Sequence, residues 1–482
     1  MTMNDTLSPV AFPSYDRSAL TPGIVHIGLG NFHRAHMAVY LDDLFALGIG
    51  LDWAILGAGV RAGDARMRDA LLAQDCLSTI ITLDPAGKSA RRVGSMTGFI
   101  EVQADNAALI AAMANPAIRI VSLTVTEGGY FIDAATGKFD PTAPEILADA
   151  ANPGTPVTAF GAILAALRLR KAAGVAPFTV MSCDNLPGNG HVAEAAVVEL
   201  ARLSDAGFAH WVQDNVAFPN GMVDRITPAT GPRERALAQS FGLADPVPVT
   251  CEPFGQWVLE DNFPSGRPPL EKVGVTFTPH VHAFEMMKIR ILNGGHAIIA
   301  YPGGLMDIEY VHEAMANPLI SGFLDKVERE EIIPTVPPVP ATDIAAYYDL
   351  IRSRFSNSEI GDTERRLCLD GSNRQPKFII PVMRDVLASG RLPVGLILES
   401  ALWCRYCMGV SDSGALIEPN DPSWDRLQTT ARAAASDPSV WLAMEDIYGD
   451  IGRDRAVIAA FGAALDDLAA KGTAEVLRAF IG

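Results

Sequence analysis

The first half of this chain alternates short apolar segments with longer helical patterns. The apolar segments are rich in β-branched residues, as in RIVSLTVT at 119–126. Such alternation is typical of parallel strands joined by helices that cover the sheet. We therefore predict an α/β fold over residues 1–280, a Rossmann-like domain with a mostly parallel sheet. The predicted strands are 24–28, 52–60, 77–83, 119–126 and 178–183, and the predicted helices are 33–47, 64–73 and 157–172.

The pattern changes near residue 280, after which helical segments follow one another. They are separated by clusters of proline and glycine, such as IIPTVPPVP at 332–340. Residues 281–482 therefore predict a second domain that is mainly α-helical. Its predicted helices are 284–302, 305–333, 341–355, 395–409, 425–448 and 454–480.

Charge and composition exclude several classes of function. The formal net charge is −18 and the sequence pI is near 4.9. A nucleic-acid partner requires a basic surface, and an anionic membrane repels an acidic protein, so we expect neither partner. The N-terminus lacks the basic and apolar regions of a signal peptide, and no run of about 18 apolar residues predicts a membrane span.

The six cysteines are sparse for a chain of 482 residues. They resemble reduced thiols, and we expect a cytoplasmic protein. Cys404 and Cys407 form an isolated CxxC in WCRYC. We interpret them as two positions on a buried helix rather than as a redox or zinc site.

Residues 285–301 form a largely apolar helical pattern that contains a lysine, an asparagine and a histidine with chemistry suited to catalysis. The segment reads EMMKIRILNGGHAIIAY and includes Lys288, Asn293 and His296. At about 100° per residue, all three could face one side of a helix. Burying an amine, an amide and an imidazole costs free energy unless they are used. Together they are the groups needed to hold and deprotonate an alcohol.

A glycine-rich turn follows the first predicted strand and opens a helix. Close backbone approach and a helix N-terminus suit the pyrophosphate of a dinucleotide. The third glycine of the usual fingerprint is absent, and His33 stands in its place. The residues expected to bind the cofactor here are Gly28, Gly30, Asn31 and Phe32.

An acidic residue after the second strand should bind the ribose of the cofactor. Asp52 precedes that strand, whereas Asp64 follows it. An aspartate at that place favours the free 2′-hydroxyl of NAD and repels the 2′-phosphate of NADP. Asp64 could also simply interact with the dipole of its own helix. The nearby Arg61 could instead bind a 2′-phosphate, so NADP is an alternative cofactor.

Six segments, in order along the chain, carry a resemblance to a known family. They are IVHIGLGNFHRAHMAVY (24–40), VSLTVTEGGY (121–130), TVMSCDNLPGNG (179–190), FPNGMVDRITP (218–228), CEPFGQWVLEDNF (251–263) and the K-x4-N-x2-H signature at 288–296. With these motifs the chain resembles the mannitol dehydrogenase family, also called the polyol-specific long-chain dehydrogenases/reductases. The resemblance covers nearly the whole chain, and the last motif is highly specific.

The resemblance implies an N-terminal nucleotide-binding domain, a helical substrate-binding domain over 281–482 and an active site between them. It implies oxidation of a polyol to a ketose by hydride transfer to NAD, with no metal, in a protein that is often monomeric. Carried over by motif, Lys288 is the general base. Asn293 and Asn185 stabilise the developing alkoxide, and His296 binds a substrate hydroxyl.

Four further residues match family positions outside this set. Asp224, in MVDR, matches a position close to the substrate, and Glu285 matches a residue that gates a water path for the proton. Arg366 and Arg374 match positions that contact outer hydroxyls of the polyol. Arginines are also common on solvated surfaces, which is the alternative interpretation of these two.

One departure from the family pattern leaves the substrate open. Several mannitol-oxidising relatives carry a lysine where GSNRQPKF (371–378) has Arg374. The planar guanidinium suits carboxylates, so a uronate reductase that interconverts fructuronate and mannonate is an alternative to oxidation of D-mannitol to D-fructose. D-Arabinitol and other polyols also remain possible substrates. A nucleotide-binding sensor without activity is a further alternative, although every catalytic group of the family motif is present.

Overall fold

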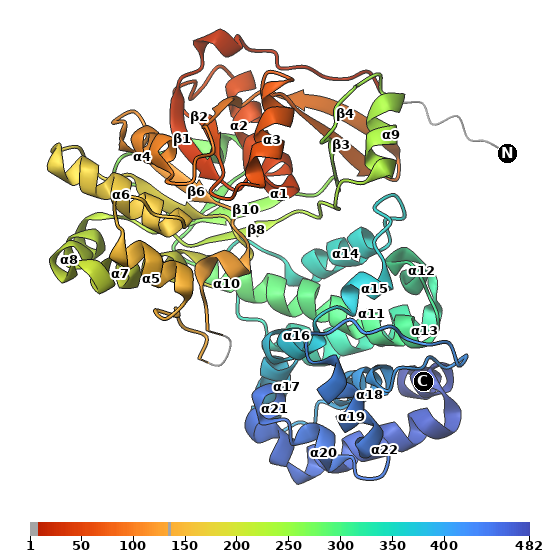
Figure 1. Cartoon of the computed structure of the whole chain (residues 1–482). Coiled ribbons are helices and arrows are strands. Elements are labelled where there is room, and N and C mark those ends of the chain that lie inside the picture. Colours follow the sequence, from red (N-terminus) through yellow and green to blue (C-terminus); the bar gives the residue numbers. More distant parts are fainter. Residues whose placement is uncertain (1–7, 134–135) are drawn as a thin grey trace. The chain divides into compact units, whose positions relative to one another are not determined.

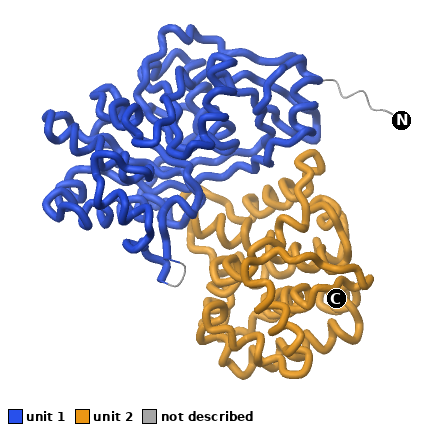
Figure 2. The backbone as a smooth tube through the Cα atoms, in the orientation of Figure 1, with its two compact units in different colours: residues 1–282 blue, residues 283–482 orange. Residues whose placement is uncertain are grey.

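The chain forms two compact units. The structure is a computed structural model that describes residues 8–133 and 136–482. Unit 1 comprises residues 1–282 and unit 2 residues 283–482, coloured blue and orange in Figure 2. Each unit is described by itself below.

A five-stranded parallel sheet is the centre of unit 1 (Figure 1). Its order is β5-β2-β1-β6-β7, and every neighbouring pair in it is parallel. The predicted parallel sheet is therefore confirmed. The order reverses between β1 and β6, where the carboxyl ends of the strands leave a crevice in doubly wound folds. The strands are β1 (Pro22–Ile27), β2 (Ala54–Ala58), β5 (Met96–Phe99), β6 (Ile120–Leu123) and β7 (Thr179–Ser182).

Both faces of this sheet are buried, which explains its continuous apolar strands. Val25 and Ile27 of β1 pack toward α4 (Ala107–Ala114), α6 (Ala159–Ala172) and α7 (Asn189–Ser204). Ile24 points to the other face, where α2 (Met37–Ala46) and β10 (Gln256–Leu259) cover the sheet. The alternation of side chains along β1 also places His26 on the face of Ile24.

The predicted strand at 77–83 is correct as a strand but belongs to another sheet. It is β3 (Ser78–Asp84), which pairs antiparallel with β4 (Gly87–Val93) and parallel with β9 (Val249–Cys251). An apolar run predicts burial but not which neighbour the strand finds. A third sheet has the order β11-β10-β8, with β8 (Gly221–Asp224) and β11 (Thr276–Phe277) on either side of β10.

The predicted helix at 33–47 is interrupted. It forms α1 (Asn31–Ala35) and α2 (Met37–Ala46), with His36 between them at φ −120° and ψ −94°. The pattern of apolar residues continues through His36, so periodicity gave no sign of the break. The other helices of unit 1 are η1 (Arg17–Ala19), α3 (Asp64–Leu72), η2 (Glu127–Tyr130), α5 (Pro144–Ala151), α8 (Ala206–Asn215), α9 (Pro232–Ser240) and η3 (Leu270–Val273).

Unit 2 is built of helices, as predicted. Its core joins α11 (Gly294–Leu305), α13 (Pro318–Val327), α18 (Val394–Cys407) and α22 (Arg455–Lys471). The predicted helices 305–333, 425–448 and 454–480 are each divided into shorter ones. The remaining elements are α10 (Val281–Met287), which begins at the end of unit 1, η4 (Lys288–Asn293), α12 (Val311–Ala316), η5 (Glu328–Ile332), η6 (Ile333–Thr335), α14 (Ile344–Phe355), α15 (Glu364–Leu367), α16 (Gly371–Phe378), α17 (Ile380–Ala388), α19 (Trp424–Ala434), α20 (Ser439–Leu442), α21 (Glu445–Tyr448), η7 (Gly449–Arg453) and α23 (Thr473–Ile481).

The cysteines are buried and unpaired. Cys404 and Cys407 lie on α18, which confirms that the CxxC is part of a buried helix. Within residues 8–133 and 136–482, no helix is both long and apolar enough to cross a membrane.

Candidate functional site

The polar segment at 285–301 is one helical run with a widened turn in its middle. α10 carries Glu285, the π-helical η4 runs from Lys288 to Asn293, and α11 carries His296. Glu285 and Lys288 are buried, and Asn293 is half-buried. The helix does not break at the glycines that follow Asn293. Single π turns inside α-helices are frequent at functional sites.

The widened turn changes which side chains share a face. Neighbours on one face of an α-helix are three and four residues apart. In a π-helix the hydrogen bonds run one residue further, so the neighbours become four and five residues apart. Lys288 and Asn293 are five apart and therefore share a face of η4. His296 follows Asn293 by three residues, the spacing of the regular α11.

His296 is a neutral imidazole with an unused nitrogen. Its Nε2 is buried and has no hydrogen-bond partner in the part of the chain that the structure describes. The ring stacks on Phe355 with centroids 4.3 Å apart and 17° between the planes. Burial lowers the pKa of His296 well below its usual value, and the charges of Arg366, Arg354, Arg374 and Lys288 lower it further. A neutral ring suits a hydrogen bond to a hydroxyl.

The charges of three arginines and of the predicted base therefore act on the predicted substrate-binding histidine. Arg366 pairs with Asp362 on the preceding turn. Arg374 donates from Nη1 to the carbonyl of Leu367, 3.0 Å away. Unit 2 thus brings Lys288, His296 and both predicted arginines within electrostatic reach of one another.

Sequence reasoning missed two members of this cluster, Arg354 and Phe355. Both are buried near the end of α14. No motif singles them out in LIRSRF, because their role depends on a contact with His296 more than 50 residues away. A Cβ at Gly295 would lie 3.3 Å from the Phe355 ring, so this glycine lets the ring reach α11.

The helix that carries Arg374 is fixed to the core by a buried polar pair. Gln375 Nε2 donates to Glu399 Oε1 on α18 at 2.5 Å. Glu399 is fully buried, and this burial raises the pKa of its carboxyl from 4.5 to about 8. Glu399 is therefore protonated in the folded protein at neutral pH, where an unfolded chain would hold it ionised.

This shift predicts a pH-dependent stability. As pH rises from about 4.5 to about 8, the unfolded state loses the proton of Glu399 and the folded state keeps it, so the free energy of unfolding falls by up to about 1.4 kcal/mol per pH unit. Glu399→Gln removes this slope and keeps the amide contact. Urea unfolding at pH 5, 6, 7 and 8 checks it, with the exposed Glu418→Gln as control. Parallel pH profiles for wild type and Glu399→Gln would contradict the assignment.

In unit 1 the glycine-rich turn follows β1 directly. Gly28 has φ +99°, and a Cβ there would meet the Thr124 carbonyl oxygen at 2.1 Å. Only glycine therefore fits where the ends of β1 and β6 approach. A Cβ at Gly30 would meet nothing within 4 Å. The backbone of the turn is thus open on the side of Gly30, as the approach of a pyrophosphate requires.

Asn31 and Phe32 hold this turn in place. Asn31 Nδ2 donates to the Pro228 carbonyl at 2.7 Å and to Thr230 Oγ1 at 3.0 Å. The ring of Phe32 stacks on His36, with centroids 4.7 Å apart. Asn31 is committed to contacts within unit 1 and therefore acts on the turn as a structural tie.

Asp64 is the first residue of α3, after the carboxyl end of β2. Its Oδ2 accepts the backbone N–H of Arg61 at 2.9 Å. Asp52 lies before β2 and pairs with Arg119. Only Asp64 is therefore at the end of the strand where a ribose-binding carboxylate is expected.

Asn185 and Asp224 lie in two segments of unit 1 that the side chain of Asn189 joins. Asn185 is exposed in the loop after β7, and Asp224 is the buried last residue of β8. Asn189 Nδ2 donates to the Asp184 carbonyl, and its Oδ1 accepts from the N–H of Gly221. This one side chain joins the loop of Asn185 to the strand of Asp224.

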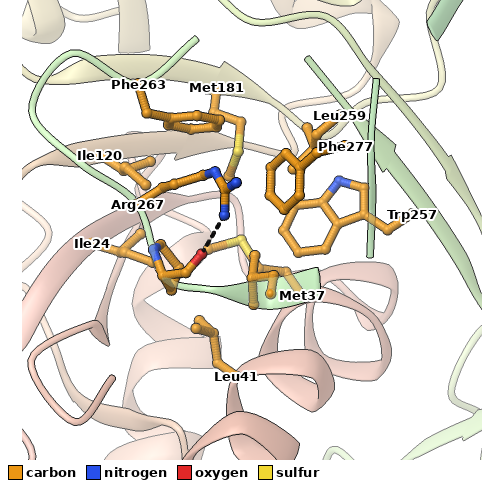
Figure 3. A pocket seen from close by; sticks show the side chains of 12 residues that line it. Ile24, Met37, Leu41, Ile120, Met181, Trp257, Leu259, Phe263, Arg267 and Phe277 are labelled. Carbon is orange, nitrogen blue, oxygen red and sulfur yellow. Dashed lines mark hydrogen bonds between the residues drawn. The ribbon is translucent and has the colours of Figure 1, made fainter. Parts of the chain in front are cut away.

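A small apolar pocket in unit 1 contains none of these residues (Figure 3). It lies between β1, α2 and β10, where Ile24, Met37 and Trp257 contribute to its wall. Arg267 covers it, with its guanidinium 3.5 Å from the centroid of the Phe277 ring. An apolar gap without convergent polar groups is a packing feature rather than a site for a polyol.

A metal site was not expected. Within the described residues, no three side chains of His, Cys, Asp and Glu gather in a way that could hold a metal ion. That the reaction proceeds without a metal stays a prediction.

Comparison with known proteins assigns the chain to a family. Residues 22–272 match the family model described as "Mannitol dehydrogenase Rossmann domain", and residues 280–469 match "Mannitol dehydrogenase C-terminal domain". This chain belongs to the mannitol dehydrogenase family. The predicted resemblance is thereby confirmed, and the chain is an oxidoreductase that acts on a CH–OH group.

Members of the mannitol dehydrogenase family resemble the chain over almost their whole length. The mannitol 2-dehydrogenase of Cereibacter sphaeroides is 71% identical over 98% of this chain and 99% of its own. The solved Pseudomonas fluorescens mannitol 2-dehydrogenase, a ternary complex with NAD and D-mannitol, is 42% identical with a TM-score of 0.87 and covers 98% and 96%. A substrate-free D-sorbitol dehydrogenase is 35% identical with a TM-score of 0.90, and 98% of each chain is covered.

Proposed function

We propose that this protein oxidises D-mannitol to D-fructose with NAD, without a metal. The observation that carries the proposal is the Lys288, Asn293 and His296 set on a widened helical turn. The 71% identity to a mannitol 2-dehydrogenase and the NAD and D-mannitol in a 42% identical relative support it.

The reaction needs a base and a stabiliser of negative charge. A hydride leaves the carbinol carbon only as its oxygen loses a proton. Lys288 is the base that takes this proton, and Glu285, one turn earlier on α10, passes it to water. The amide NH₂ groups of Asn293 and Asn185 donate to the same oxygen as negative charge develops, and so act as an oxyanion hole.

The remaining residues hold the polyol. Neutral His296 hydrogen-bonds a substrate hydroxyl through its unused Nε2. Arg366 and Arg374 donate to outer hydroxyls, and Asp224 accepts from one. Several donors and acceptors with fixed directions discriminate between polyols, because a wrong configuration leaves buried polar groups unpaired.

NAD supplies the hydride acceptor when it is bound. The residues of unit 1 fit it: the open backbone at Gly30 admits the pyrophosphate, and Asp64 accepts from the ribose hydroxyls. The carboxylate of Asp64 repels a 2′-phosphate, which favours NAD over NADP.

The cations around His296 favour a second candidate, a sugar acid as substrate. The charges of Arg354, Arg366, Arg374 and Lys288 all act on His296 and lower its pKa. Such a cluster would bind the carboxylate of mannonate or fructuronate. Against this, Arg366 is already paired with Asp362.

A substrate panel with both cofactors tests the proposal. Initial rates of NADH and NADPH formation are measured with D-mannitol, D-sorbitol, D-arabinitol and D-mannonate. We expect the highest kcat/KM with D-mannitol and NAD. Turnover confined to mannonate would replace the polyol assignment by the sugar-acid one. Tight NADH binding without turnover of any substrate would indicate a sensor.

Replacing Asp64 should weaken the preference for NAD. In Asp64→Ala the repulsion of the 2′-phosphate is lost, so we expect the ratio of kcat/KM for NAD over NADP to fall on the order of ten-fold, about 1.4 kcal/mol. The exposed Asp69→Ala on the same helix is the matched control. An unchanged ratio of kcat/KM for NAD over NADP would mean that another group recognises the ribose.

A further inference from the structure

His33 takes the place of the third glycine of the dinucleotide fingerprint. That glycine usually allows a helix to pack closely on the first strand. Here His33, on α1, lies flat on His26 of β1, with ring centroids 3.4 Å apart and 15° between the planes. Both side chains are fully buried. A stacked pair of imidazoles therefore fills the contact that a glycine makes elsewhere.

His26 is bonded on both sides of its ring. Nε2 lies 3.0 Å from the Gly28 carbonyl oxygen and 2.8 Å from Thr124 Oγ1, and Nδ1 lies 2.7 Å from Ser122 Oγ. A carbonyl only accepts, so Nε2 carries the proton and Nδ1 accepts from the Ser122 hydroxyl. Burial lowers the pKa of His26 to about 3, so the ring keeps this neutral form at working pH.

These bonds determine the direction of the first peptide of the turn. Gly28 O accepts from the hydroxyl of Thr124 as well as from His26. In a planar trans peptide the carbonyl and the next N–H point in opposite directions. Fixing the carbonyl of Gly28 toward His26 therefore turns the N–H of Leu29 away from it. Backbone N–H groups of such a turn are what bind a pyrophosphate.

His33 contributes packing rather than hydrogen bonds. Both of its ring nitrogens are buried without a hydrogen-bond partner in the described part of the chain. Leaving them unsatisfied is unfavourable, so the ring position must be stabilised by its contacts, of which the stack on His26 is the closest aromatic one. His33 covers His26 and prevents water from competing for Nε2.

We propose that His26, covered by His33, is a positioning residue for the dinucleotide-binding turn. It acts through the Gly28 carbonyl and does not touch the cofactor. This inference rests on the proposed function, since the turn must bind NAD for its shape to matter. Ser122 in β6 and Thr124 just after it hold the His26 ring through their hydroxyl groups.

The test separates the hydrogen bond from simple packing. His26→Leu keeps volume but loses the Nε2 donor, and we expect the Kd for NADH and the KM for NAD to rise about ten-fold or more, with the KM for polyol and kcat at saturating NAD nearly unchanged. His26→Gln places an amide N–H near the position of Nε2 and should recover most of the cofactor affinity. NADH binding is followed by fluorescence, and circular dichroism confirms folding.

Two variants of His33 test the stack. His33→Gly restores the usual fingerprint, yet it should weaken NADH binding because His26 loses its cover. His33→Phe keeps a flat ring without the unpaired nitrogens and should bind NADH like the wild type. If His26→Leu and His26→Gln bind NADH equally well, the positioning role is overturned. If the wild type itself binds no dinucleotide, the proposed function fails instead.

Discussion

Lys288→Ala should lower kcat by a factor of about 10²–10⁴, the usual contribution of a positioned general base. In the proposed mechanism Lys288 takes the proton while the hydride leaves, so the variant lacks the base. The KM for polyol should change less, because hydroxyl contacts are made by other side chains. Initial rates of NADH formation, measured from pH 6 to 10, give both parameters.

Three controls sharpen the Lys288 result. Lys471→Ala, on the exposed side of α22, should keep full activity. NADH should bind Lys288→Ala like the wild type, since the turn at Gly28 is unaltered. Small primary amines added to Lys288→Ala should restore part of the rate. Wild-type turnover in the variant would show that the base is another group.

Asn293→Ala and Asn185→Ala should each lower kcat by about 10²–10³, the effect of removing one oxyanion donor. In the proposed mechanism both amides serve one oxygen. The double variant should therefore fall by less than the product of the single losses. Steady-state kinetics at saturating NAD and polyol gives kcat for the two single variants and for the double variant.

Asn→Asp variants distinguish donation from packing at these two positions. Aspartate matches asparagine in size but presents only acceptors when ionised, so it should be at least as harmful as alanine. The exposed Asn373→Ala is the matched control in unit 2. An active Asn293→Asp would show that the side chain fills space without stabilising charge.

The sequence predicts the architecture well where local pattern determines it. β-branched runs such as 119–126 identify strands of the main sheet, because burial on both faces demands them. The segment 77–83 has the same apolar, β-branched composition. Its pairing with 87–93, however, is decided by the hairpin that joins the two segments. The break at His36 depends on contacts with β10, such as the bond to Gln256 O, that no local window contains.

Some residues of the candidate site can likewise be predicted from the local sequence, and others cannot. Lys288, Asn293 and His296 are visible because polar groups in an apolar helix stand out. Arg354 and Phe355 are invisible because a cation and an aromatic residue near the end of an amphipathic helix are ordinary. Their relation to His296 arises only when α14 packs beside η4 and the Phe355 ring meets His296. The stacked pair of His26 and His33 is likewise hidden, since strand and helix must fold together before the rings meet.

The π turn at Lys288–Asn293 also links the spacing of these two residues to the conformation of the segment. A π turn accommodates one residue more than an α-helical turn, so removing one residue between Lys288 and Asn293 would restore a regular helix. The asparagine would then follow the lysine by four residues and would still share its face. If the turn tightened to a regular helix with all its residues kept, Asn293 would instead lie about 140° from Lys288. The spacing of five residues therefore keeps the lysine and the asparagine on one face only while the turn stays π-helical.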